Sequence, residues 1–163
     1  MNAQRKILTP EQLTVWRDWI RQAGRSLVVT NGCFDLLHAG HVTYLEQARQ
    51  NGDALLVGLN SDESVRALKG EGRPLNSEMD RAIVLAALEA VDAVCVFQEA
   101  GADRFLAATR PDVWVKGGDY TLESLNPVER HVVESAGGRI VIIPFVPGRS
   151  TTSIVGKIRR QNF

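Results

Sequence analysis

The chain has little of what stabilises secreted proteins or attaches proteins to membranes. It contains only two cysteines in 163 residues, and two widely separated cysteines without a signal segment favour reduced thiols over a disulfide. No apolar run approaches the roughly 20 residues that span a bilayer, and the first residues carry no apolar signal core. Net charge is also missing, because 19 Lys and Arg balance 19 Asp and Glu. We therefore expect a cytoplasmic protein with neither nucleic acid nor membrane as a partner.

Repeats, linkers and low-complexity tracts are absent as well, which predicts a single domain. A chain of this length can bury about two-thirds of its unfolded surface, so it needs no disulfide or metal to fold. Residues 1–25 are interpreted as an N-terminal amphipathic helical segment, with Thr9 as N-cap and Gly24 just past the helix end. Residues 26–163 are interpreted as the main domain. The helix also carries two tryptophans whose face leaves room for a homodimer: Trp16 and Trp19.

After residue 26, short apolar runs alternate with segments of helical periodicity. Strands are predicted at 27–30, 54–59, 93–97, 113–116 and 140–145. Helices are predicted at 42–49, 79–90, 103–109, 128–135 and 153–160. Strands that are each followed by a helix predict an α/β fold, a Rossmann-like doubly wound sheet of five parallel strands with helices on both faces. Such sheets bind ligands at the carboxyl ends of their strands, near the point where the strand order reverses.

Polar, glycine-rich segments follow four of the five predicted strands. They occupy residues 31–41, 60–62, 116–120 and 148–153. Because the carboxyl ends of parallel strands share one edge of a sheet, we expect these segments to lie together there.

Two histidines flank Gly40 at the first predicted strand-to-helix turn. A helix N-terminus offers backbone N–H groups and a positive dipole end to a phosphate, and Gly40 lets the phosphate approach the backbone closely. His38 and His41 are three residues apart, so both can donate hydrogen bonds to phosphoryl oxygens as charge develops. The alternatives are that the two histidines are ordinary polar surface residues or that they form half of a zinc site. Zinc is disfavoured because His131 lies far along the chain and neither cysteine has metal-ligand spacing.

Hydroxyls and cations add to the phosphate chemistry expected at this edge. Residues 150–153 put four hydroxyls before the last helix, where a plain N-cap needs one. Lys116 ends an apolar run, and residues 69–74 are interpreted as a mobile loop with two cations, for which a solvated loop is the alternative. Arg81 stands in a first helical turn, where the dipole disfavours a cation unless an anion is near. Asp35 could hold Mg²⁺ or form a structural turn.

Together these segments resemble the HxGH nucleotidyltransferases. The resemblance rests on residues 30–41, 69–74, 80–81, 116–120 and 150–153, and it covers nearly the whole chain. The likeness is greatest to the adenylyltransferase domain that makes ADP-heptose from ATP and D-glycero-β-D-manno-heptose 1-phosphate. Cys33 stands where the related glycerol-phosphate and choline-phosphate cytidylyltransferases carry Thr. The sugar-kinase domain to which this adenylyltransferase is often fused is not in this chain, so a separate sugar kinase is an expected pathway partner.

The resemblance implies AMP transfer from ATP to a sugar 1-phosphate, with release of pyrophosphate and with Mg²⁺ bridging the nucleotide phosphates. It implies ADP-heptose synthesis for a lipopolysaccharide core, with no metal site built by the protein itself. The implied catalytic residues are His38, His41 and Lys116. The implied nucleotide-binding residues are Asn31, Gly32, Cys33, Phe34, Asp35, Gly40, Gly117, Asp119, Ser150, Thr151 and Thr152. The implied contacts to triphosphate or sugar phosphate are Lys69, Arg73, Arg81 and Arg149. A cytidylyltransferase, an adenylyltransferase for another acceptor such as glycerol 3-phosphate, and a non-catalytic nucleotide-binding module are the alternatives.

Overall fold

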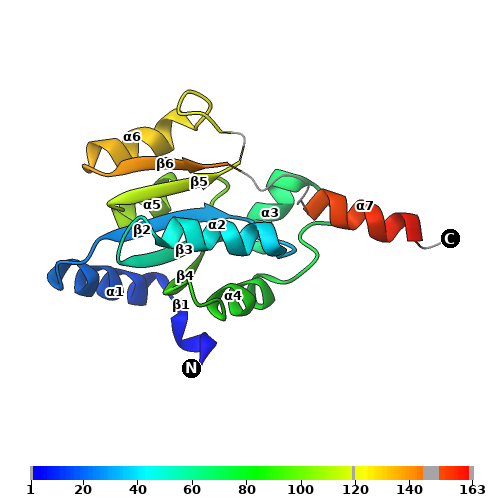
Figure 1. Cartoon of the computed structure of the whole chain (residues 1–163), viewed down its shortest axis with the longest axis horizontal. Helices are drawn as coiled ribbons and strands as arrows, with labels where there is room; N and C mark the ends of the chain where they lie inside the picture. Colours follow the sequence, from blue (N-terminus) through cyan, green and yellow to red (C-terminus); the bar gives the residue numbers. More distant parts are fainter. Residues whose placement is uncertain (1, 119, 145–150, 162–163) are drawn as a thin grey trace.

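A parallel sheet of six strands forms the centre of the computed structural model, which describes residues 2–118, 120–144 and 151–161. The strands are β1 (Ile7–Leu8), β2 (Leu27–Gly32), β3 (Ala54–Asn60), β4 (Ala93–Phe97), β5 (Val113–Gly117) and β6 (Arg139–Ile143). Their order across the sheet is β1-β4-β3-β2-β5-β6, and every neighbouring pair is parallel (Figure 1). The predicted doubly wound parallel sheet is confirmed. The predicted count of five strands is wrong by one.

The extra strand, β1, is too short to be recognised from its own sequence. Ile7 and Leu8 pair with Val94 and Cys95 of β4, so the partner strand creates the element. The helix that follows begins at Pro10, and its N-cap Thr9 accepts a hydrogen bond from the Gln12 N–H, as the sequence predicts. The N-terminal segment thereby joins the edge of the main sheet.

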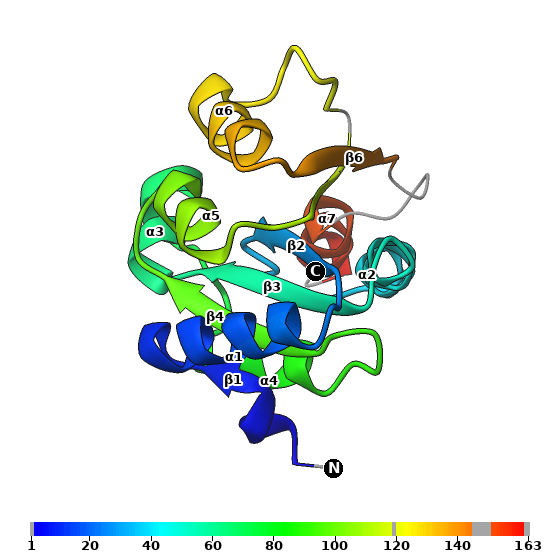
Figure 2. The same ribbon diagram turned by 90° about the vertical axis from the view of Figure 1, so that its left-hand side faces the viewer.

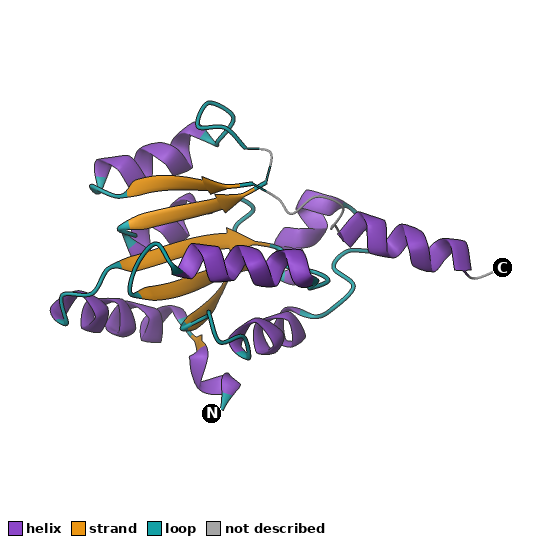
Figure 3. Cartoon of the chain, in the orientation of Figure 1, coloured by secondary structure: helices purple, strands orange, loops and turns teal. Residues whose placement is uncertain are grey.

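Helices cover both faces of the sheet (Figures 2 and 3). Among the described residues they are η1 (Ala3–Lys6, a 3₁₀ helix), α1 (Pro10–Gln22), α2 (Ala39–Arg49), α3 (Asp62–Lys69), α4 (Glu78–Ala86), α5 (Asp103–Thr109), α6 (Pro127–Ser135) and α7 (Thr151–Gln161). Buried residues of α1, α5 and α6 share one hydrophobic cluster, while those of α2 and α4 share the other. α3 was not predicted. Because α3 extends to Lys69, this residue ends a helix and does not begin a loop.

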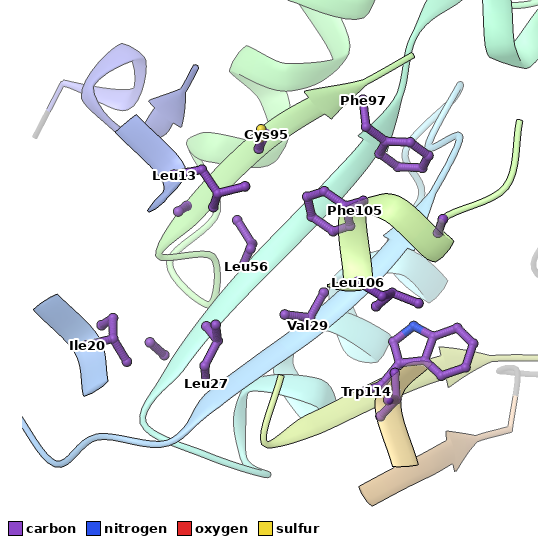
Figure 4. Packing of buried hydrophobic residues seen from close by; sticks show 14 of the residues in the cluster. Leu13, Ile20, Leu27, Val29, Leu56, Cys95, Phe97, Phe105, Leu106 and Trp114 are labelled. Atoms are coloured by element: carbon purple, nitrogen blue, oxygen red, sulfur yellow. The ribbon is translucent and has the colours of Figure 1, made fainter. Parts of the chain in front are cut away.

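Alternation along the central strands divides the core into these two clusters. Leu27 and Val29 of β2 belong to the cluster with α1 and α5, and Val28 between them belongs to the cluster with α2. Figure 4 shows the first cluster, in which Ile20 of α1 and Trp114 of β5 both lie. Strands buried on both faces account for the apolar runs that the sequence shows.

The two tryptophans of α1 differ in their surroundings. Trp16 packs against the first cluster, whereas Trp19 is 55% exposed and has the Arg25 guanidinium 5.7 Å from its ring. The homodimer that this face could support stays a prediction.

The strand order reverses between β2 and β5. From β2 the chain builds β3 and β4 on one side, and then crosses to build β5 and β6 on the other. The segments that leave the carboxyl ends of β2 and β5 therefore flank the position where parallel α/β sheets bind ligands.

Candidate active site

The His-x-Gly-His turn lies at the start of α2. His38 is the N-cap, with an extended backbone, and its carbonyl accepts hydrogen bonds from the N–H groups of His41 (2.9 Å) and Val42 (3.3 Å). The helix begins at Ala39, three residues before the predicted Val42, which places Gly40 inside the first turn. The positive dipole end of α2 is thus located at the two histidines.

The two imidazoles lie against each other. The ring centroids of His38 and His41 are 4.0 Å apart with an interplanar angle of 28°, and Phe34 packs against His41 at 5.4 Å. Phe34 adopts a left-handed backbone with φ of 44°, unusual for a bulky residue, and a Cβ on Gly32 would approach its ring to 3.1 Å. The conformation of the loop after β2 therefore places the Phe34 ring against the His41 ring.

The burial of His41 determines its charge. Burial, with a smaller contribution from the neighbouring His38, lowers the pKa of His41 from 6.5 to about 4. Its Nδ1 atom is buried and has no hydrogen-bond partner among the described residues. At neutral pH, His41 is an uncharged imidazole and can offer an N–H group rather than a positive charge.

Tyr44 holds α2 over the junction of β2 and β5. Its hydroxyl is 2.6 Å from the Thr30 hydroxyl of β2 and donates to the Val115 carbonyl of β5 at 3.1 Å. A Cβ on Gly117 would come within 2.7 Å of the Tyr44 ring, so glycine is needed there for α2 to approach β5. Burial raises the pKa of Tyr44, which stays a neutral donor. Sequence reasoning assigned Gly117 to the ligand and missed Tyr44, whose partners are distant in sequence.

Lys116 projects from β5 between two aromatic rings. Its Nζ lies 5.3 Å from the Trp114 ring centroid and 5.2 Å from that of Tyr120. Burial lowers the pKa of Lys116, and the nearby negative charge of Glu129 offsets part of that effect. Trp114 also donates from Nε1 to the Asn31 side-chain oxygen at 3.0 Å. The Trp114 side chain therefore contacts both Asn31 and Lys116.

Asp35 anchors the segment that carries Arg73. Its carboxylate accepts hydrogen bonds from Arg73 (2.5 Å) and from the N–H groups of Leu75 (2.7 Å) and Asn76 (3.3 Å). Burial would raise the pKa of Asp35, but these three hydrogen bonds outweigh it and hold the pKa below its usual value. Of the two interpretations left open by the sequence, these contacts favour the structural turn over a Mg²⁺ ligand.

Arg81 is almost completely buried, with 2% of its surface exposed. Its guanidinium donates to the carbonyls of Cys33 (2.6 Å), Asn60 (2.9 Å) and Asn76 (3.1 Å) and to the Asp62 carboxylate (2.7 Å). In this structure it joins the segments that follow β2 and β3. A direct contact between Arg81 and substrate phosphate stays a prediction.

Several predicted residues converge around the loop after β2. The charges of Lys69, Arg81 and Lys116 all act on the Cys33 thiol, whose pKa is nevertheless raised because it is buried. Thr151, the first residue of α7, donates from its hydroxyl to the Leu36 carbonyl at 3.2 Å, so the hydroxyl-bearing helix starts beside the histidine turn. Asp119, Arg149 and Ser150 lie outside the described residues, as does the side chain of Thr152.

Comparison with known proteins agrees with this geometry. The sequence profile of the family described as cytidylyltransferase-like matches residues 29–154, from β2 into α7. The chain belongs to the cytidylyltransferase-like family. The matched span contains the histidine turn and both strands at the point where the strand order reverses, and nucleotidyl transfer is the class of reaction that the family indicates.

Close relatives carry a more specific name. The bifunctional protein HldE of Pseudomonas fluorescens (strain SBW25) is 52% identical over 159 residues, 98% of this chain and 33% of the relative. HldE of Geotalea uraniireducens (strain Rf4) is 57% identical over 136 residues, 83% of this chain and 27% of the relative. The chain thus spans a third or less of these two relatives.

Two solved structures resemble most of the fold. A lipopolysaccharide core biosynthesis protein from Thermoplasma volcanium GSS1 aligns with a TM-score of 0.60 and 25% identity, covering 76% of this chain and 98% of that one. A pantoate-β-alanine ligase from Francisella tularensis aligns with a TM-score of 0.61 at 16% identity, covering 90% of this chain and 68% of that one, and shows the fold alone.

In the described part of the chain, no helix is long and apolar enough to cross a membrane.

Proposed function

We propose that this chain transfers AMP from ATP to a sugar 1-phosphate, with heptose 1-phosphate as the acceptor, and releases pyrophosphate. The observation that carries the proposal is the stacked pair of His38 and His41 at the N-terminus of α2, where the strand order reverses. The heptose acceptor is supported by the resemblance to the adenylyltransferase domain that makes ADP-heptose, together with the HldE relative that is 52% identical over 98% of the chain.

In the proposed reaction a phosphate oxygen of the acceptor attacks the α-phosphorus of ATP. A new P–O bond forms as the bond from the α-phosphorus to the bridging oxygen of the β-phosphate breaks, and pyrophosphate leaves. No general base is required because a phosphate monoester is already an anion at neutral pH. Catalysis consists of holding two repelling anions in line and stabilising the charge that develops between them.

The site residues divide that work by their electrostatics. His41 is neutral and donates a hydrogen bond that strengthens as the phosphoryl oxygens gain charge. Lys116 supplies the cation, and the N-terminus of α2 supplies a fixed dipole. Asn31 and Lys116 lie on the face of the sheet that carries Trp114, whereas Tyr44 holds α2 against the other face. The nucleotide would thus lie across the carboxyl edge of the sheet.

Mg²⁺ fits this site as a companion of ATP. Among the described residues no three histidine, cysteine, aspartate or glutamate side chains cluster to hold a metal ion. Mg²⁺ is commonly bound through substrate phosphates with few protein ligands, and it would neutralise charge on the leaving pyrophosphate. Asp35, whose oxygens already receive three hydrogen bonds, is not needed for it.

The greater length of the relatives is relevant to how the sugar 1-phosphate acceptor is made. They are named bifunctional and are about three times as long as the matched segment. We propose that a sugar kinase activity supplies the 1-phosphate acceptor, and that both reactions take place in the cytoplasm, where ATP is available.

Pyrophosphate release measured for ATP and CTP against a panel of sugar and polyol phosphates tests this proposal. We expect release with ATP and heptose 1-phosphate, and less with CTP. Higher kcat/KM with CTP and glycerol 3-phosphate would assign the chain to a cytidylyltransferase branch. ATP binding without release for any acceptor would make the chain a non-catalytic nucleotide-binding module.

A further inference from the structure

Trp114 contacts two groups of the candidate site from within the hydrophobic core. Its side chain is fully buried, in the cluster that also contains Phe105 and Leu106 (Figure 4). Its Nε1–H donates to Oδ1 of Asn31 at 3.0 Å, and the Lys116 ammonium lies 5.3 Å from its ring centroid. One buried side chain therefore connects two polar residues that come from different strands.

The register of β2 and β5 explains how these groups meet. Val29 of β2 lies opposite Trp114 of β5, and side chains alternate between the faces of a sheet. Asn31 and Lys116 each stand two residues further toward the carboxyl edge and so project on the same face as Trp114. The hydrogen bond of 3.0 Å shows that the Trp114 indole reaches Asn31 diagonally across these two parallel strands. The indole thus lies directly below the two polar groups.

The hydrogen bond determines which end of the Asn31 amide faces a ligand. An indole N–H is only a donor, so its partner atom on Asn31 is the oxygen. The amide nitrogen and its two N–H groups then point away from Trp114. The opposite orientation would leave a buried indole N–H without its acceptor, which is costly.

The ring face holds the Lys116 ammonium in a different way. An aromatic face attracts an ammonium without cancelling its charge, as a carboxylate would. Among the described residues, no carboxylate forms a salt bridge with Lys116. The cation is therefore held in place yet keeps its charge for an anionic ligand.

We propose that Trp114 is a positioning residue that presents the amide N–H groups of Asn31 and the ammonium of Lys116 to acceptor atoms of the bound nucleotide. The inference rests on the proposed function, because ATP is the nucleotide. It adds a residue that does not itself touch the ligand and acts through two that do.

A double-mutant cycle measured by calorimetric binding of ATP with Mg²⁺, without an acceptor, tests the inference. Trp114→Phe keeps a ring face but removes the N–H, and it should weaken ATP binding about fivefold, as expected for one lost hydrogen bond. Asn31→Ala should weaken binding at least as much. The double variant should bind no more weakly than Asn31→Ala alone, because Trp114 acts through Asn31. Phe105→Leu, from the same cluster, is the matched control and should leave ATP affinity unchanged.

The indole N–H resonance of Trp114 gives a second readout that does not depend on folding of the Trp114 variant. This resonance should shift in Asn31→Ala, which removes its acceptor, and it should also shift when ATP is added to the wild-type protein. The signals of Trp16 and Trp19 on α1 serve as internal controls and should stay in place.

The outcomes separate this inference from the proposed function. Fully additive effects of Trp114→Phe and Asn31→Ala, or an unmoved Trp114 signal in Asn31→Ala, would overturn the positioning role alone. A wild-type protein that binds no ATP would overturn the inference and the proposed function together. Normal coupling in the cycle without turnover of any sugar phosphate would contradict only the proposed function.

Discussion

Replacing His41 with glutamine should make the stability of the fold less sensitive to acid. In the folded protein the pKa of His41 is about 4, lowered from 6.5 by burial and by the neighbouring His38. Between these two values the unfolded chain binds a proton that the folded chain excludes, so the free energy of unfolding falls as the pH falls. This contribution is fully present above pH 6.5 and is lost progressively toward pH 4.

The size of the effect follows from that shift. Lowering the pKa from 6.5 to about 4 corresponds to about 3.4 kcal/mol, since a tenfold change in the protonation equilibrium is worth about 1.36 kcal/mol. Because His41 is only partly buried, solvent screening reduces this free energy, and we halve it to about 1.7 kcal/mol. In a domain of this size such a difference moves the Tm by about 3 to 6 °C.

Thermal unfolding followed from about pH 7.5 down to about pH 4 measures the effect, because most of the stability change falls between the two pKa values. His41→Gln should lose less Tm over this interval than the wild-type protein. Carboxylates titrate in both proteins, so the difference between the two curves isolates His41. His131→Gln, which removes an exposed histidine of α6, should follow the wild-type curve. Parallel curves for wild type and His41→Gln would refute the assignment of His41 as a neutral imidazole whose pKa is lowered in the fold.

Three further predictions concern catalysis and folding. His38→Ala and His41→Ala should each lower kcat about a hundredfold while changing ATP affinity much less, because the lost hydrogen bonds strengthen only in the transition state; equal losses in binding and kcat would argue for a structural turn. If the segment that carries Arg73 closes over the triphosphate, Lys69→Ala and Arg73→Ala should impair turnover, and ATP with Mg²⁺ should slow limited proteolysis near Arg73. Unchanged kinetics and unchanged cleavage would show that this segment has no part in catalysis. Tyr44→Phe should lower the free energy of unfolding by about 1 to 3 kcal/mol in urea denaturation, since it takes the side-chain partner from the buried Thr30 hydroxyl and removes the hydrogen bond to the Val115 carbonyl. An unchanged midpoint would show that Tyr44 does not tie α2 to the sheet.

Sequence periodicity was sufficient for the elements that are long or strongly patterned. The five longer strands and most helices lie where apolar runs and caps predict them, because these signals act over a few residues. β1 and α3 were missed for opposite reasons. β1 exists through its pairing with Val94 and Cys95, whereas α3 has a polar sequence with few buried residues, for which no helix was predicted.

The candidate site also contains residues that the sequence could place and residues that it could not. His38 and His41 could be placed together from sequence because a spacing of three residues at the start of a helix brings their side chains close. Arg73 is paired with Asp35, 38 residues away, a contact that the sequence did not reveal, and its contact with the substrate stays a prediction. A charge seen in sequence shows that a cation is present, but not which acceptor it will find.

By itself the sequence determined the parallel α/β fold, the sheet edge that carries the polar segments, and the family of chemistry. These depend on local patterns and on the rule that parallel strands place their carboxyl ends together. Only the tertiary structure decided that His41 is neutral, that Tyr44 ties α2 to the sheet, and that Trp114 supports Asn31 and Lys116. Charge state depends on burial, and these contacts join residues as far apart as the 83 positions between Asn31 and Trp114. Such properties arise when distant segments pack, because no local pattern contains both partners.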